Sequence, residues 1–143
     1  LKEEVVRALN SKDGYALQYA SKNNYQIFII TGGYSEDLKK RLIDLGINDV
    51  FLRSNNKIDV YNGIKEKYGI ADKQVLYMGD DIPDIPVLHV AGVSCCPQDA
   101  AIDVKQVVDY HSPIDGGKGC VREVIEQTLR VQGKWLSKNA FQW

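Results

Sequence analysis

Several features that mark other classes of protein are scarce in this sequence of 143 residues. It has three cysteines, two of them adjacent and none in a CxxC pair, so neither a disulfide framework nor a zinc site is indicated. No apolar run reaches the roughly 18 residues that would span a membrane. The 18 basic and 19 acidic side chains give a net charge of -1, and therefore no electrostatic basis for binding nucleic acid or a membrane surface. We expect buried, reduced cysteines and a cytoplasmic location.

Methionine occurs once, at Met78, and the sequence begins at Leu1. We therefore expect further residues to precede Leu1 in the full-length protein. The opening segment LKEEVVRALN does not have the pattern of a signal peptide. Repeats, low-complexity tracts and linkers rich in proline or glycine are also missing, so we expect residues 1–143 to form a single domain, large enough to bury a substantial core.

Apolar runs alternate with helical patterns along the chain. The expected strands are Val5–Leu9, Tyr25–Thr31, Asp49–Leu52, Val75–Met78, Ala91–Cys95 and Gln106–Asp109. The expected helices are Asp13–Asn23, Ser35–Leu45, Asn56–Tyr68, a turn from Asp84, a helix around Ala100–Val104 and Val121–Leu129. This alternation predicts an α/β fold with a doubly wound, mainly parallel sheet. Ligands of such sheets lie beyond the carboxyl ends of the strands, so the residues that follow each strand are the candidates for function.

Two strand ends carry groups suited to an anion. The turn Thr31-Gly32-Gly33 follows the run YQIFII, where a hydroxyl and backbone N–H groups at the start of a helix can hold an anion. Thr-Gly is also ordinary turn and cap chemistry. Lys57 stands at the start of the next helix, where it opposes the favourable sign of the helix dipole. It is therefore either a solvated surface lysine or one turned towards an anion at the same edge of the sheet.

The segment VLYMGDDIPD places three carboxylates directly after a buried strand: Asp80, Asp81 and Asp84. Such crowded carboxylates repel one another unless a cation offsets their charge. Mg²⁺ takes oxygen ligands, often one or two protein carboxylates together with water and a substrate phosphate. Helix capping explains one of these aspartates but not all of them. The segment predicts a Mg²⁺ site, and a hydroxyl, a lysine and an acidic loop in this order predict phosphoryl transfer.

Two other phosphate-handling classes do not fit the sequence. A response-regulator receiver would show its acidic site before the hydroxyl and the lysine, whereas here the acidic residues come last. A P-loop requires GxxxxGK[ST], but Ser112 stands where the first glycine before Gly117-Lys118 belongs. Both classes are therefore set aside.

Six segments together resemble one known family. IITGG, NNKID and YMGDDIPD resemble the second, third and fourth motifs of the haloacid dehalogenase-like (HAD) phosphatase superfamily. NSKDGYAL, GGKGCVREV and QGKW resemble its small branch without a cap domain, which contains 3-deoxy-D-manno-octulosonate (KDO) 8-phosphate phosphatase and relatives acting on other eight- or nine-carbon sugar-acid phosphates. The match runs from Asn10 to Trp135. It implies a Rossmann-type domain that, in full-length form, is a Mg²⁺-dependent phosphomonoesterase of lipopolysaccharide precursor synthesis.

The resemblance implies a role for each motif residue. Thr31 corresponds to the phosphate-binding hydroxyl, with Gly32 as a backbone donor. Lys57 corresponds to the lysine that neutralises the phosphate and the nucleophile. Asp80 corresponds to the carboxylate that binds Mg²⁺. Asp81 and Asp84 are not expected to bind the metal directly. The resemblance implies that they contact metal-bound waters or Lys57.

For the substrate, Arg41 aligns with a basic position that relatives use for the sugar-acid carboxylate. The loop with Gly117 and Lys118 resembles one that relatives place near the active site of a neighbouring subunit in tetramers. A homotetramer is therefore implied. Arg122 has either a structural role or a direct one. The aromatic residues of the tail are the candidate contact surface: Trp135, Phe141 and Trp143.

Two departures from the family pattern matter. Gly33 stands where some relatives carry arginine, so substrate contacts at that position do not carry over. The first motif, a strand ending in Asp-x-Asp that supplies the nucleophile, is absent, because Asp13 already matches the later Asp-Gly segment. We expect the nucleophile upstream of Leu1, and without that strand its two neighbours would be unpaired. The alternative is a non-catalytic, truncated HAD-like domain that serves as an assembly or fusion module.

Overall fold

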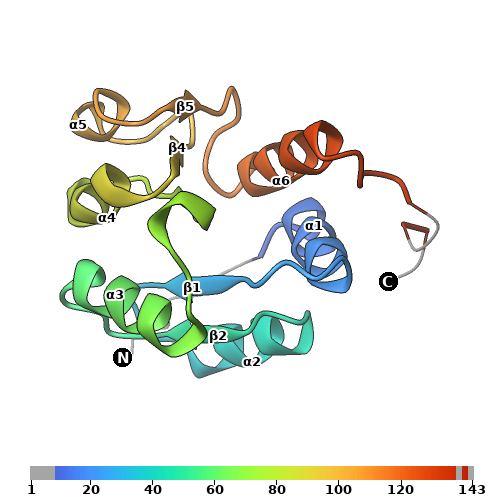
Figure 1. Ribbon diagram of the computed structural model, residues 1–143, viewed down its shortest axis with the longest axis horizontal. Helices are drawn as coiled ribbons and strands as arrows, with labels where there is room; N and C mark the ends of the chain where they lie inside the picture. Colours follow the sequence, from blue (N-terminus) through green and yellow to red (C-terminus); the bar gives the residue numbers. More distant parts are fainter. Residues whose placement is uncertain (1–8, 138–139, 142–143) are drawn as a thin grey trace, which may run out of the picture.

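The computed structural model describes residues 9–137 and 140–141, in which strands and helices alternate (Figure 1). The strands are β1 (Phe28–Ile30), β2 (Asp49–Phe51), β3 (Leu76–Met78), β4 (Val93–Cys96) and β5 (Tyr110–His111). The helices are α1 (Ser11–Lys22), α2 (Glu36–Asp44), α3 (Lys57–Tyr68), α4 (Ile85–Val90), α5 (Ile102–Lys105) and α6 (Cys120–Val131), with short 3₁₀ turns η1 (Asp72–Gln74) and η2 (Ile82–Asp84). The predicted α/β class is confirmed.

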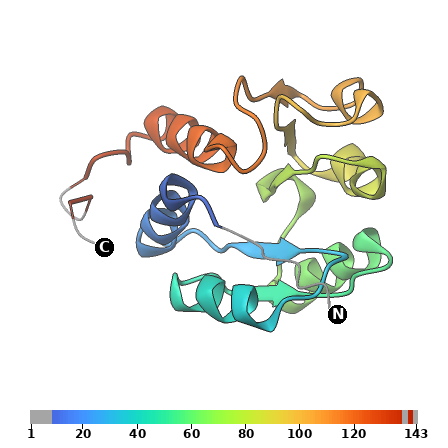
Figure 2. The same ribbon diagram turned by 180° about the vertical axis from the view of Figure 1, so that it is seen from behind.

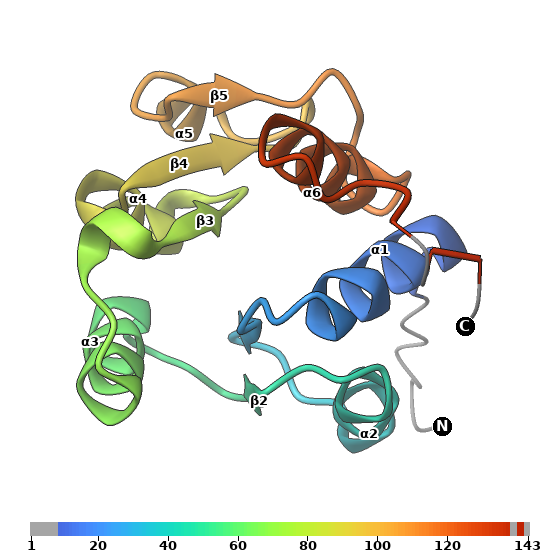
Figure 3. The same ribbon diagram turned by 45° about the vertical axis from the view of Figure 1, so that its right-hand side comes forward.

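The strands form two separate sheets, β1–β2 and β3–β4–β5, and every pair is parallel. Within the described part of the chain, no strand is hydrogen-bonded between β1 and β3, and Figure 3 shows the two sheets apart. The expectation that a strand is missing between two neighbouring strands stays a prediction. The expected strand Val5–Leu9 lies outside the described residues, apart from Leu9, which belongs to no strand.

Local sequence explains where α2 and α3 begin and end. The hydroxyl of Ser35 accepts a hydrogen bond from the N–H of Leu38 (3.2 Å) and so caps α2. After α3, Gly69 adopts φ +65, a left-handed conformation that glycine reaches without steric cost. Buried Leu42 of α2 packs with Val50 of β2 in one hydrophobic cluster. Figure 3 shows α2 and α3 on opposite sides of the β1–β2 sheet, as in a doubly wound fold.

The last strand lies at a different place from the one predicted. Gln106–Asp109 was expected to be a strand because of its two valines, but these residues form the turn that leaves α5. Asp109 sets the register instead. Its N–H donates to the hydroxyl of Ser94 (3.0 Å), and its carboxylate accepts from the N–H of Ser94 (2.9 Å). This reciprocal pair places Tyr110 opposite Cys95 of β4, so the strand begins one residue after Asp109.

Helices α1 and α6, from opposite ends of the described chain, lie side by side (Figures 1 and 2). Asp13 is only 5% exposed, and its carboxylate accepts from the N–H of Arg122 (2.9 Å) in the first turn of α6. Tyr19 and Leu129 are buried against each other, and the Trp135 ring lies edge-on to Tyr19 with centroids 5.3 Å apart. Part of the aromatic tail is therefore held inside the domain. Trp143 lies outside the described residues.

Candidate phosphate and metal site

Thr31 begins the loop that leaves the carboxyl end of β1. Its N–H donates to the carbonyl of Phe51 (3.0 Å), and its carbonyl accepts from Ser54 (2.9 Å), so the loops after β1 and β2 are tied together. Its Oγ1 accepts from the N–H of Gly33 (3.1 Å). The hydroxyl proton of Thr31 is not used in this bond, and the N–H of Gly32 has no acceptor among the described residues. Both donors suit phosphate oxygens.

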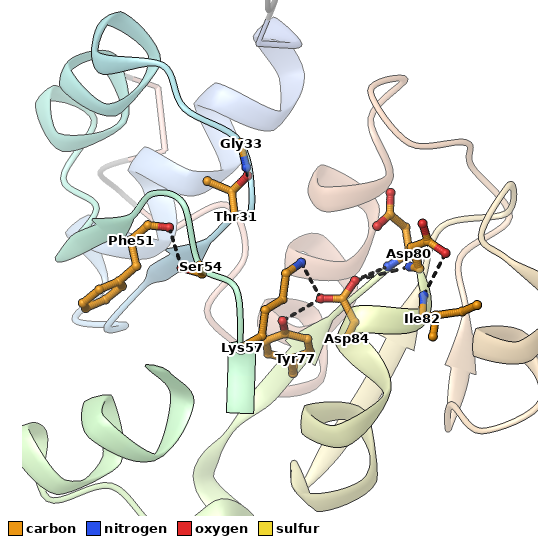
Figure 4. A network of polar contacts seen from close by, with 10 residues as sticks. Thr31, Gly33, Phe51, Ser54, Lys57, Tyr77, Asp80, Ile82 and Asp84 are labelled. Carbon is orange, nitrogen blue, oxygen red and sulfur yellow. Dashed lines mark hydrogen bonds and ion pairs between the residues drawn. The ribbon is translucent and has the colours of Figure 1, made fainter. Parts of the chain in front are cut away.

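Lys57 does not extend into solvent from the start of α3. Its Nζ lies 2.8 Å from Oδ1 of Asp84, and the two side chains are 16% and 3% exposed. The hydroxyl of Tyr77 donates to the same Oδ1 at 2.8 Å (Figure 4). Burial works against the charge on Asp84, but the hydrogen bonds from Lys57 and Tyr77 outweigh it and hold the pKa of Asp84 below its ordinary value. The pair joins the strand end of β2 to that of β3 across the interrupted sheet.

Asp84 also shapes the acidic loop through its second oxygen. Its Oδ2 accepts from the backbone N–H groups of Asp80 (3.0 Å) and Asp81 (3.3 Å). A Cβ at Gly79 would lie 2.4 Å from the Cβ of Asp84, so the loop requires glycine at that position. The carboxylate of Asp81 accepts from the N–H of Ile82 (2.8 Å) and caps η2. The oxygens of Asp84 are thus occupied by protein donors and not left for a metal.

Asp80 has the carboxylate that fits a metal best. Partial burial and the nearby charge of Asp84 raise the pKa of Asp80, with Lys57 opposing them. A cation beside Asp80 would relieve this repulsion. No group of at least three His, Cys, Asp or Glu side chains between residues 9 and 137 is placed to hold a metal. Mg²⁺ needs as few as one or two protein carboxylates, with water and phosphate completing its ligands.

Figure 4 shows Thr31, Lys57, Asp84 and Asp80 in this order across one view of the site. Lys57, Asp84 and Asp80 are joined by direct hydrogen bonds. Among the described residues, Thr31 makes no direct hydrogen bond with Lys57 or Asp80, and its link to them runs through the loop after β2. The structure brings the predicted lysine and acidic loop together, and it links Thr31 to the loop that leads to Lys57. The roles assigned to these residues are still predictions.

The residues predicted to bind substrate lie further from this core. Arg41 lines a hollow of about 340 Å³ between α1 and α2, with Asn10 and Asp44 in the same wall. Gly117 and Lys118 are exposed in the turn before α6. The carbonyl of Gly117 accepts a long hydrogen bond from Asn10 (3.4 Å).

The partly exposed side chain of Arg122 packs against α1 and the tail. Its guanidinium lies over the rings of Tyr15 (5.4 Å) and Trp135 (5.1 Å), and its Nε is 3.5 Å from Oε1 of Glu126. Cation–π contacts of this kind stabilise the packing of helices on a tail. The geometry therefore supports the structural role for Arg122.

Sequence reasoning did not identify Tyr77 or Arg53. Tyr77 reads as one more apolar residue of a buried strand, and nothing in the pattern shows that its hydroxyl reaches Asp84. Arg53 stands in the loop after β2 and stacks on Tyr34, with its guanidinium 4.1 Å from the ring centroid. A basic residue directly after a strand, four positions before Lys57, was the available signal.

A haloacid dehalogenase-like hydrolase family model matches residues 3–92. The chain belongs to this family. It is 37% identical over 131 residues to the KDO 8-phosphate phosphatase KdsC of Salmonella typhi, which covers 92% of this chain and 70% of that protein. It is 32% identical to the protein of the same name from Haemophilus influenzae, over 92% of this chain and 73% of that one.

Solved structures support the same family. The KDO 8-phosphate phosphatase of Moraxella catarrhalis, in complex with magnesium ion, phosphate ion and KDO, superposes with a TM-score of 0.88 at 31% identity, covering 91% of this chain and 75% of that one. The cobalt-bound phosphatase of Haemophilus influenzae superposes with a TM-score of 0.89 at 30% identity, covering 96% and 80%. Of these two solved structures, one holds magnesium and the other cobalt, and the Asp80 loop has carboxylate oxygens of the kind that Mg²⁺ takes. In the described part of the chain, none of the helices is long and apolar enough to cross a membrane.

Proposed function

We propose that the full-length protein is a Mg²⁺-dependent phosphomonoesterase that hydrolyses a sugar-acid phosphate. KDO 8-phosphate or a related eight- or nine-carbon sugar-acid phosphate is the proposed substrate. The observation that carries the proposal is the buried bridge Lys57–Asp84, which draws the strand end of β2 to the acidic loop after β3. Identity to relatives named as KDO 8-phosphate phosphatases supports the substrate class.

Each side chain has a physical task in this proposal. The hydroxyl of Thr31 and the N–H of Gly32 donate to phosphate oxygens, and Lys57 brings a positive charge to the same oxygens. Asp80 would hold the metal, and the positive charge of the metal would offset the negative charge that develops on the transferred phosphoryl group. Asp84 keeps Lys57 and the backbone of the acidic loop in fixed positions, so little reorganisation is needed during the reaction.

The nucleophile belongs to a further part of the proposal. The 143 residues contain no Asp-x-Asp, and the described residues leave β1 and β3 without a strand between them. We place the nucleophilic aspartate on a strand between β1 and β3, contributed by residues upstream of Leu1. An aspartate there would follow its strand at the same edge as Thr31 and Asp80. A full-length protein without such an aspartate would instead support a non-catalytic assembly or fusion module.

Substituting Asp80 tests the proposal directly. Asp80→Ala in the full-length protein is expected to lower Mg²⁺-dependent phosphate release from KDO 8-phosphate by more than about a hundredfold, since it removes the carboxylate that holds the metal. Asp103→Ala, which removes an exposed aspartate from α5, is the control for the change in charge. Full activity of Asp80→Ala would refute the assignment of Asp80.

A further inference from the structure

The loop after β2 holds Arg53 in an unfavourable conformation. Its φ is +51, in the left-handed region that residues with a Cβ rarely adopt. Among the described residues, the other non-glycine residues with positive φ are Asn24 and Leu136. Asparagine tolerates this region, but arginine has no local hydrogen bond to favour it. Such strain persists where the surrounding structure fixes the residue, and it is found at ligand sites.

Two contacts fix Arg53. Its N–H donates to the carbonyl of Gly33 (3.0 Å), which ties its backbone to the turn after β1. Its guanidinium lies over the ring of Tyr34, 4.1 Å from the centroid. Tyr34 is 52% exposed, and Arg53 forms no ion pair with any described residue. The guanidinium is therefore held in one orientation while its donors face solvent.

Backbone hydrogen bonds place Arg53 in the loop that is tied to the turn after β1. Arg53, Tyr34 and Lys39 line an open hollow of about 550 Å³, together with two acidic residues, Glu36 and Asp49. The next residue, Ser54, donates to the carbonyl of Thr31 (2.9 Å), and the same loop leads into Lys57. Gly33 offers no side chain here, so Arg53 provides the cation beside the turn.

We propose that Arg53 determines substrate specificity by binding the carboxylate of the sugar-acid phosphate while Thr31 and Lys57 hold its phosphate. The inference rests on the proposed function and identifies the side chain that binds the carboxylate of the substrate. A guanidinium binds a carboxylate through two parallel N–H donors, and stacking on Tyr34 fixes the plane of that fork. Arg41, the basic residue expected from the sequence, lines a separate hollow between α1 and α2, away from the Thr31 loop.

The test compares two ligands in the full-length protein with Mg²⁺. One is KDO 8-phosphate, and the other is the same phosphate with its carboxylate reduced to a hydroxymethyl group. Arg53→Gly removes the guanidinium and adopts the positive φ readily, so the variant is expected to fold. It is expected to raise KM for the acid about tenfold or more, with kcat and the KM of the reduced analogue unchanged.

Two further variants sharpen the comparison. Arg53→Lys keeps the charge without the planar fork and is expected to fall between the wild type and Arg53→Gly. Asn24→Gly relieves a positive φ at an exposed position and is expected to change the melting temperature alone. Equal loss for both ligands in Arg53→Gly, or no loss for either, would overturn the inference while leaving the phosphatase intact.

Calorimetric binding separates this inference from the proposed function. If the wild type hydrolyses neither ligand, the proposed function fails, but the Kd values of both ligands still decide the role of Arg53. A wild type that binds the acid more tightly than the reduced analogue, with the preference lost in Arg53→Gly, supports it. Equal affinity of the wild type for the two ligands overturns it. Inorganic phosphate, as a third ligand, is expected to bind equally to both proteins.

Discussion

Asp84 positions more groups of the site than any other side chain in the acidic loop, because it accepts four hydrogen bonds. One oxygen accepts from Lys57 and Tyr77, and the other accepts from two backbone N–H groups of the loop. The side chain is only 3% exposed, and a buried carboxylate that lost one of these donors would be left partly unsatisfied. Tyr77 therefore helps to position Lys57 although it need not touch a substrate.

The chain contains a matched arrangement that isolates this effect. Tyr61 and Lys65 both contact Oδ1 of Asp72 at 2.7 Å, as Tyr77 and Lys57 contact Asp84, but the side chain of Asp72 is 44% exposed. Tyr77→Phe is expected to lower kcat of the full-length protein about tenfold and to reduce the free energy of unfolding by about 1–2 kcal/mol. Urea denaturation and initial rates measure the two effects.

Tyr61→Phe is the control for this prediction. It removes the same hydroxyl from the more exposed arrangement, so a smaller loss of stability and unchanged kcat are expected. If both variants reduced kcat equally, Tyr77 would have no special part in positioning Lys57. The comparison would then point to general loss of packing.

Among the elements, the contact of α6 with α1 depends on a cap supplied from another helix. Gly119 at the N-cap position of α6 has no side chain, and Asp13 of α1 accepts the N–H of Arg122 in its place. Burial raises the pKa of Asp13, while the hydrogen bond from Arg122 opposes the rise. The carboxylate thus joins the two helices and also caps the start of α6.

Removing that cap should weaken the helix pair. Asp13→Ala is expected to lower the free energy of unfolding by about 1–2 kcal/mol, the usual range for loss of an N-cap. Asp13→Asn keeps an acceptor oxygen and should retain most of the stability. Asp37→Ala, in the exposed first turn of α2, controls for the loss of an acidic residue near a helix start. Urea midpoints of the variants provide the measurement, and unchanged stability in Asp13→Ala would contradict the cap.

Most elements follow from local sequence, because apolar periodicity, caps and glycines act over a few residues. Ser35 and Gly69 mark helix ends correctly for that reason. The strand β5 was misplaced because its register depends on the pairing of Asp109 with Ser94, which are 15 residues apart in sequence. Lys57, Asp80 and Asp84 were found because they follow strands, whereas Tyr77 and Arg53 depend on contacts that only the folded chain creates.

At the scale of the whole molecule, all three cysteines are buried. Burial, followed by the nearby Cys96, raises the pKa of Cys95 to about 12, against about 8.5 for a free thiol. Above pH 8.5 the unfolded chain loses this proton while the folded chain keeps it. The stability contributed by the neutral thiol is therefore present below pH 8.5 and is lost as the pH rises towards 12.

The consequence is a protein that is sensitive to alkali. Between pH 7 and pH 10 the free energy of unfolding is expected to fall by up to about 2 kcal/mol from Cys95 alone, at about 1.4 kcal/mol per pH unit above 8.5. Cys95→Ala should show a shallower decline, and Lys118→Ala, at an exposed position, should follow the wild type. Urea midpoints across this pH range measure the slopes. Parallel slopes for wild type and Cys95→Ala would count against the raised pKa.

The pairing of α1 with α6 also bears on how the chain reaches its fold. The bond from Arg122 to Asp13 joins residues 109 positions apart, with both sheets contained in the intervening chain. Closing a loop of that length costs only about 0.6 kcal/mol more than closing one half as long. The larger consequence is for the rate, since contacts of high sequence separation slow folding. The feature that brings the two ends of the described chain together therefore raises the contact order of the whole domain.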